Sequence, residues 1–121
     1  MYNKRKIGYN GETIACNYLL KKNYKIIDRN FRCPIGEIDI ICEKDNTYIF
    51  IEVKTRKNLK YGLPAESVNY YKRQKIINIA KWYLVKNKLT DKMCRFDIIE
   101  IYFENKDYKI NHIINAWIEG Q

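Results

Sequence analysis

The chain has 121 residues and a formal net charge of +9, with 46% hydrophobic residues, five Gly and two Pro. This length suffices for one hydrophobic core and is too short for two, so residues 1–121 are expected to form a single domain. The composition is typical of a compact folded protein rather than of a disordered chain, and no segment approaches the roughly 18 uncharged residues of a membrane span. The N-terminus "MYNKRKIGYNGE" is basic and lacks the apolar stretch of a signal peptide, so a cytoplasmic protein without a membrane partner is expected.

The predicted elements follow one another in the order αβββαββ. A helix is expected over residues 11–22, strands over 24–31, 37–42 and 48–55, a long helix after Pro64, and strands over 95–103 and 108–114. Tight turns are expected at Asp45 and Asn46 and at "ENKD" (104–107). This order predicts an α/β fold, in which a mixed β-sheet is flanked by helices.

Basic residues gather at Lys4 to Lys6, Lys21 and Lys22, Lys54 to Lys60, and Lys72 to Lys75. An excess of positive charge of this size indicates a polyanionic partner, and nucleic acid is favoured over a membrane because no basic amphipathic segment stands apart from the fold.

Cysteine and histidine chemistry is not favoured by the spacing. The four cysteines, Cys16, Cys33, Cys42 and Cys94, form no C-x-x-C pair, and the single histidine is His112. A zinc site is therefore not expected. A Cys/His nucleophile pair remains an alternative to the commoner role of cysteine as a buried side chain.

Three charges interrupt the apolar strands of "GEIDIICEKDNTYIFIEVKTR" (36–56), namely Asp39, Glu52 and Lys54. Alternation along a strand sets Tyr48, Phe50, Glu52 and Lys54 on one face, with the Cα atoms of Glu52 and Lys54 about 7 Å apart. Counting outward from the turn places Asp39 opposite Glu52, give or take one residue. Two adjacent, partly buried carboxylates repel each other unless a cation or a proton lies between them.

Other readings of these charges stay open at this point. Lys54 can form a structural ion pair with a carboxylate. Glu12 heads the apolar stripe of the first helix and is expected to face the sheet, or else to complement the helix dipole in the first turn. Lys72 lies on the core stripe of the long helix, where a lysine needs a buried stem and an anion for its head.

Two short motifs carry a family resemblance. They are "GEID" (36–39) and, after twelve intervening residues, "EVK" (52–54), between a helix with Glu12 and a helix with Lys72. This arrangement resembles the PD-(D/E)XK nuclease superfamily, although Ile38 stands where the namesake Pro precedes the first Asp. Longer stretches are similar to the small bacterial YraN-like proteins, a group generally classed as predicted endonucleases related to Holliday-junction resolvases: "GYNGETIACNYLLKKNYKIIDRNFR", "GEIDII", "IEVKTR", "GLPAESV" and "RFDIIEI".

The resemblance implies a restriction-endonuclease-like fold and a metal-dependent endonuclease. Asp39, Glu52 and the carbonyl of Val53 would then bind Mg²⁺ or Mn²⁺, which prefer oxygen ligands. Lys54 would orient or deprotonate the attacking water or stabilise developing charge. Glu12 would complete the metal site or hold a second ion.

The expected partner is nucleic acid, DNA rather than RNA and branched by analogy with resolvases, which also suggests a homodimer. The candidates for phosphate contacts are Arg29, Arg32, Arg56 and Lys72, with ordinary surface charge as the alternative. Tyr61 or Tyr70 is a candidate for stacking on a base, with core packing as the alternative. Two other functions remain open, a non-catalytic nucleic-acid-binding module and a partner-binding scaffold with the same fold.

Overall fold

The computed structural model describes residues 10–56 and 69–117, which form two helices and five strands. Their bounds are α1 Gly11–Lys21, β1 Lys25–Cys33, β2 Gly36–Lys44, β3 Thr47–Arg56, α2 Tyr70–Lys86, β4 Met93–Glu104 and β5 Asp107–Trp117. The predicted α/β class, a mixed sheet with two helices, is confirmed. Neither of these helices is long and apolar enough to span a bilayer.

One sheet holds all five strands, in the order β1–β2–β3–β4–β5. Neighbouring strands are antiparallel except for β3 and β4, which run parallel. A parallel pair needs a crossover connection, and α2 lies in the one that joins β3 to β4. The parallel register extends to Arg56 opposite Tyr102, so every residue of "EVKTR" has a neighbour on β4.

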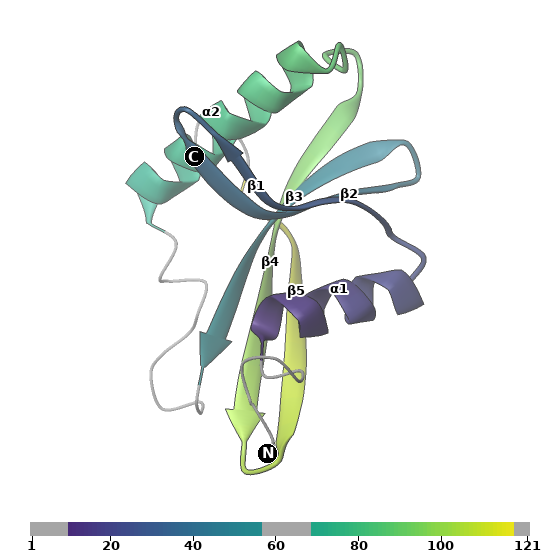
Figure 1. The fold of residues 1–121 in the computed structure, drawn as a ribbon, viewed down its shortest axis with the longest axis vertical. Coiled ribbons are helices and arrows are strands. Elements are labelled where there is room, and N and C mark those ends of the chain that lie inside the picture. Colours follow the sequence, from purple (N-terminus) through teal and green to yellow (C-terminus); the bar gives the residue numbers. More distant parts are fainter. Residues whose placement is uncertain (1–9, 57–68, 118–121) are drawn as a thin grey trace.

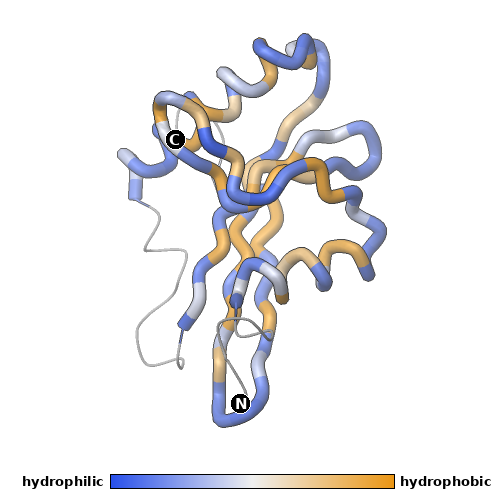
Figure 2. Tube along the Cα trace, in the orientation of Figure 1, coloured by the Kyte–Doolittle hydropathy of each residue, from blue (hydrophilic) through white to orange (hydrophobic). Residues whose placement is uncertain are grey.

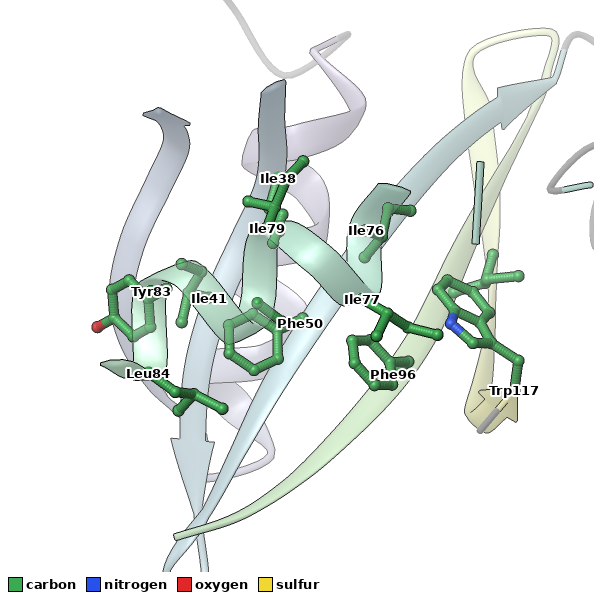
Figure 3. Close-up of a cluster of buried hydrophobic side chains, with 12 residues drawn as sticks. Ile38, Ile41, Phe50, Ile76, Ile77, Ile79, Tyr83, Leu84, Phe96 and Trp117 are labelled. Atoms are coloured by element: carbon green, nitrogen blue, oxygen red, sulfur yellow. The ribbon is translucent and has the colours of Figure 1, made fainter. Parts of the chain in front are cut away.

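The two helices cover opposite faces of the twisted sheet (Figure 1). On one face α2 packs Ile76, Ile77, Ile79 and Tyr83 against Phe50, Phe96 and Trp117 (Figure 3). On the other face α1 packs Ile14, Ala15 and Leu19 against Ile40, Ile49 and Ile51. Hydrophobic stretches accordingly occupy the central parts of the strands and recur along both helices (Figure 2).

Side chains along β3 alternate between these two cores as the sequence predicts. Phe50 belongs to the core under α2, whereas Ile49 and Ile51 belong to the core under α1. By the same alternation Glu52 and Lys54 follow Phe50 on the face that α2 covers. Glu52 and Lys54 therefore lie on β3 just beyond the core that α2 covers, toward the end of the strand.

Short polar signals set the turns and the helix starts. Asp45 and Asn46 both have positive φ, 51° and 62°, as a two-residue hairpin of type I′ requires, so the predicted turn is confirmed. The Asn10 side chain accepts the N–H of Glu12 at 2.9 Å and caps α1. The Asn69 side chain accepts the N–H of Lys72 at 3.0 Å and caps α2.

The boundaries differ from the predicted ones in two respects. The strands extend further, for example β2 to Lys44 and β5 to Trp117, because backbone ladder bonds continue through polar residues once the hairpins have formed. The helix expected after Pro64 is described from Tyr70, so Pro64 and Val68 lie outside the described residues.

Candidate active site between the ends of strands β2 and β3

Asp39 marks the place where β2 and β3 stop pairing. Their ladder ends with Ile40 opposite Ile51. One residue further on, Oδ2 of Asp39 accepts the backbone N–H of Val53 at 2.8 Å, so a side chain takes over the role of a backbone acceptor. Ile38 and Ile40 pack in different cores, although alternate residues of a regular strand share a face. The strand therefore turns at Asp39, which directs its carboxylate toward β3.

Asp39, Glu52, Lys54 and Lys72 form a group that we call the charge cluster. Glu52 is at its centre and is only 7% exposed. Its Oε1 lies 2.9 Å from Nζ of Lys72 and 3.7 Å from Nζ of Lys54. Lys72 thus buries part of its stem and reaches an anion, as its position on the helix requires. In the described part of the chain Glu52 thus has two lysine partners. The Asp39 carboxylate forms no ion pair with any described residue and accepts the Val53 N–H instead.

Burial and like charge shift the protonation of this cluster. Burial, together with the neighbouring charge of Glu52, raises the pKa of Asp39 from 3.8 to about 6, against the opposing effect of the Val53 N–H. Burial lowers the pKa of Lys54, and Glu52 opposes this only in part. Burial alone would also lower the pKa of Lys72, but the contact with Glu52 outweighs it and the pKa is raised. Asp39 and Lys54 are consequently the groups whose charges are least stabilised.

Glu12 reaches the same region from α1. Burial raises the pKa of Glu12, and the Glu12 charge in turn contributes to the raised pKa of Asp39. Arg29 links β1 to this helix start, because its Nε lies 3.8 Å from Oε1 of Glu12 and its terminal nitrogen donates to Oγ1 of Thr13 at 3.0 Å. Glu12 therefore lies beside the cluster of Asp39 and Glu52, with Arg29 as its cation.

The other predicted contact residues are more dispersed. Arg32 is exposed near the end of β1, with its Nε 3.2 Å from Oε2 of Glu37. Arg56 is half-buried at the end of β3, and its Nε has no hydrogen-bond partner among the described residues. Val53 is half-buried between Glu52 and Lys54. The structure thus brings Asp39, Glu52, Lys54 and Lys72 together and leaves Arg32 and Arg56 at the margins.

A groove of about 710 Å³ opens beside the carboxylates. Its lining includes Asp39, Glu52 and Lys72 of the charge cluster. The other lining residues are Arg32, Cys33, Pro34, Ile35, Gly36, Glu37, Tyr71, Lys75, Ile76 and Ile79. The walls are the turn between β1 and β2 and the first half of α2. A ligand in this groove would reach the two carboxylates from the solvent side.

The donor atoms suit a hard divalent cation. Asp39 and Glu52 offer carboxylate oxygens, and Mg²⁺ and Mn²⁺ prefer oxygen ligands. The raised pKa of Asp39 shows that its negative charge is poorly balanced by the protein alone. The described residues contain no cluster of three or more His, Cys, Asp or Glu side chains close enough to hold a metal together, so water or substrate oxygens would have to complete such a site.

Sequence reasoning missed one buried carboxylate next to these residues. Glu100 on β4 is paired with Lys54 in the parallel ladder and is only 2% exposed. Its Oε1 accepts a hydrogen bond from Nδ2 of Asn111, while its Oε2 has no hydrogen-bond partner among the described residues. The signal was present in "RFDIIEIYF", where Glu100 follows Phe96 and Ile98 at the spacing of one strand face.

Comparison with known proteins gives the same family along nearly the whole chain. Residues 11–101 match the model of the "Uncharacterised protein family UPF0102". A UPF0102 protein of Clostridioides difficile is 51% identical over 117 residues, which covers 97% of this chain and 100% of the relative. UPF0102 proteins of Caldanaerobacter subterraneus and Clostridium novyi are 47% and 48% identical over 118 and 120 residues, covering 95% and 97% of this chain and 97% and 100% of the relatives.

These matches include every residue of the charge cluster between Glu12 and Lys72. The predicted resemblance to the YraN-like proteins is confirmed at the level of the family. The chain belongs to the UPF0102 family.

Proposed function

We propose that this protein is a metal-dependent endonuclease that hydrolyses phosphodiester bonds in nucleic acid, DNA in the first place. The observation that supports it best is the meeting of Asp39, Glu52 and Lys54 where β2 and β3 part, with Oε1 of Glu52 in contact with both Lys54 and Lys72. The same three residues carry the resemblance to the PD-(D/E)XK nucleases. A charge cluster with a raised carboxylate pKa beside an open groove supports a catalytic site over a purely structural ion pair.

The proposed cation, Mg²⁺ or Mn²⁺, would be held by the carboxylates of Asp39 and Glu52 and by the carbonyl of Val53. When bound, it would polarise a phosphoryl oxygen and neutralise the charge that develops during hydrolysis. Glu12 is near enough to raise the pKa of Asp39, and it would complete the coordination through water or hold a second ion. Lys72, which contacts Glu52 here, would then be released toward a substrate phosphate.

Lys54 is the proposed acid–base or electrostatic residue. Its Nζ is next to Glu52, and burial lowers the pKa of its ammonium group. A lysine whose charge is destabilised in this way accepts and returns a proton more readily than an exposed lysine does. In its charged form the same group would stabilise negative charge on the phosphate.

Phosphate contacts would hold the nucleic acid over the cluster. The net charge of +9 favours such binding. Lys72 within the cluster, Arg29 beside Glu12, and Arg32 and Arg56 at the margins are the proposed contacts. A homodimer acting on both strands of a branched DNA, in the cytoplasm, remains part of the proposal by analogy with resolvases.

A non-catalytic nucleic-acid-binding module is the second candidate. It is favoured by the 2.9 Å contact of Lys72 with Glu52, because this ion pair already neutralises one of the two carboxylates without a metal. In that function the charge cluster would serve the fold, and substitution of Glu52 would affect stability without any activity to lose.

The test is cleavage of labelled flap, four-way junction, single-stranded and duplex substrates in Mn²⁺. Lys54→Ala and Glu52→Gln should each lower the rate at least about a hundredfold, the scale of losing a positioned acid–base or electrostatic group. Glu104→Gln removes an exposed carboxylate at the end of β4 and should leave the rate unchanged. Thermal melting of all variants shows whether they fold. Unchanged cleavage in both site variants, or no cleavage by folded wild type, would favour the binding module.

A further inference from the structure

The exposed side of α2 is unusually basic. This helix of 17 residues contains five basic residues, Lys72, Arg73, Lys75, Lys81 and Lys86, and no Asp or Glu. Positions 71, 75, 78 and 82 recur every three or four residues and therefore share one flank of the helix. They are Tyr71, Lys75, Asn78 and Trp82, and the first three are exposed. A helix with this flank offers cations and aromatic rings without any acid between them.

This flank borders two grooves that share Ile35 in the turn between β1 and β2. The first groove, of about 710 Å³, has Asp39 and Glu52 in its lining. The second, of about 510 Å³, is lined by Ile35, Asn78, Lys81, Trp82, Val85 and Lys86. Figure 1 shows the turn between β1 and β2 beside α2. We call this surface the α2 track. It runs along α2 from Tyr71 through Lys75 and Trp82 to Lys86, with Ile35 opposite. At 1.5 Å per residue it is ~22 Å long.

Apolar and aromatic groups of the α2 track face solvent. Tyr71 is 82% exposed, and Ile35 and Val85 are 44% and 66% exposed. Trp82 is half-buried, and Nζ of Lys86 lies 4.7 Å from the centre of its ring. Among the described residues that line the first groove, Glu37 is the only acid outside the charge cluster, and Arg32 contacts it at 3.2 Å. The residues that line the second groove in the described part of the chain include no Asp or Glu.

We propose that the α2 track binds a single-stranded arm of the nucleic acid, which runs away from the charge cluster along α2. This inference rests on the proposed function, because it takes the charge cluster as the place where the strand is cut. Unpaired bases expose ring faces that stack on aromatic side chains, while lysines follow the phosphates. A duplex presents mainly phosphates to such a shallow surface and would leave Tyr71 and Ile35 without a partner. The preferred substrate is thus a nucleic acid with a single-stranded arm next to the scissile phosphate.

Binding is measured by fluorescence anisotropy in EDTA, so that no cleavage is required. The probes are a labelled single strand of about 12 nucleotides and the duplex of the same sequence, within the range of single-strand site sizes. Wild type should prefer the single strand. Tyr71→Ala should weaken single-strand binding roughly tenfold with little effect on the duplex, while Tyr71→Phe keeps the ring and the affinity. Tyr108→Ala, at an exposed tyrosine on β5, is the matched control.

Two further readouts separate stacking from charge. Lys75→Ala should reduce the log–log salt slope of single-strand binding by about 0.7, whereas Tyr71→Ala should leave the slope unchanged. The chain has two Trp residues, of which Trp117 is buried. A single strand on the α2 track should therefore quench the fluorescence of Trp82, and Trp82→Phe should abolish the quenching.

The outcomes for the two proposals differ. Metal-dependent cleavage of full duplexes, with equal binding of single strand and duplex and no effect of Tyr71→Ala, would overturn the α2 track and leave the endonuclease intact. Tyr71-dependent single-strand binding without any cleavage would support the α2 track and overturn the endonuclease. Self-association in sedimentation that Tyr71→Ala abolishes, without single-strand binding, would show that the track is a protein interface and overturn the inference.

Discussion

Nζ of Lys72, in the first turn of α2, lies 2.9 Å from Oε1 of Glu52 on β3. The contact joins the start of α2 to the middle of the charge cluster. It places the ammonium group of Lys72 against a carboxylate oxygen that the proposed metal would also bind. Lys72 and a divalent cation should consequently compete for Glu52, because a carboxylate oxygen that is already neutralised attracts a second cation less strongly.

Removal of Lys72 should tighten metal binding. In Lys72→Met, which keeps most of the buried stem, we expect Mn²⁺ to bind several-fold more tightly than in wild type, with Mg²⁺ weaker than Mn²⁺ in both proteins. Asp39→Asn should abolish binding. Isothermal titration calorimetry of the three proteins measures this. Lys106→Met, in the turn between β4 and β5, is the control for loss of a lysine elsewhere. Equal Mn²⁺ affinity in wild type and Asp39→Asn would remove the site from this place.

The stability of the metal-free protein should depend on pH through Asp39. The pKa of Asp39 is raised in the folded protein, from 3.8 to about 6, so the folded state binds this proton more tightly than the unfolded state does. The stabilisation that protonated Asp39 provides is fully present below about pH 4 and is lost as the pH rises through 6. Asp39→Asn keeps an acceptor for the Val53 N–H and carries no charge. At pH 8 it should therefore be more stable than wild type by at most ~3 kcal/mol, and near pH 4 the two should be close.

Urea unfolding in EDTA at the two pH values tests this, with Glu104→Gln as the exposed-carboxylate control. Glu52→Gln should behave differently from Asp39→Asn, because it leaves Lys54 and Lys72 without their carboxylate and so lowers stability. A stability difference between wild type and Asp39→Asn that stays constant from pH 4 to pH 8 would contradict the raised pKa.

Asp97 on β4 is a further buried carboxylate, and it lies on the face of the sheet that α1 covers. Its two oxygens accept hydrogen bonds from Arg95 at 2.9 Å each, one accepts the Asn115 N–H at 2.9 Å, and the other lies 2.7 Å from Nε2 of His112. Nδ1 of His112 is 3.1 Å from the hydroxyl of Tyr18 on α1. Asp97 therefore ties β4 and β5 to the first helix.

Substitution of Asp97 should destabilise the fold strongly. Burial alone would raise the pKa of Asp97, but the bonds from His112 and Arg95 lower it below the ordinary value, so this stabilisation is present above pH 4 and is lost as the pH falls. Asp97→Asn leaves Arg95 uncompensated and should cost about 3–5 kcal/mol at pH 7. Urea unfolding beside the exposed control Asp91→Asn measures the loss. A loss below ~1 kcal/mol would show that the network is dispensable.

The start of α1 lies directly against β3. A Cβ added to Gly11 would overlap Cγ2 of Thr55, although Ala is otherwise a better helix former than Gly. Gly11→Ala should therefore cost about 1–3 kcal/mol of stability and shift Glu12 away from Asp39. Thr55→Ser removes the overlapping methyl, so the double variant should recover most of the loss in thermal melting. Equal melting temperatures for wild type and Gly11→Ala would show that the helix moves at no cost.

Local signals in the sequence determined the turns, the helix start at Asn10 and the alternation along β3. Each of these depends on residues within a few positions of one another, such as the positive φ of Asp45 and Asn46. The antiparallel hairpin between β2 and β3 then follows from the turn, and this is why Asp39 was expected near Glu52 within one residue.

Only the tertiary structure decided which distant groups reach this cluster. The contact of Lys72 with Glu52 depends on where α2 starts and how it crosses the sheet, and the pairing of Lys54 with Glu100 depends on the parallel register of β3 and β4. No signal between neighbouring residues sets the Lys72–Glu52 contact or the register of Lys54 with Glu100. Both depend on the crossover between the parallel strands β3 and β4 and on the packing of the two cores. The raised pKa of Asp39 follows in turn, since burial depends on all the elements that exclude water from it.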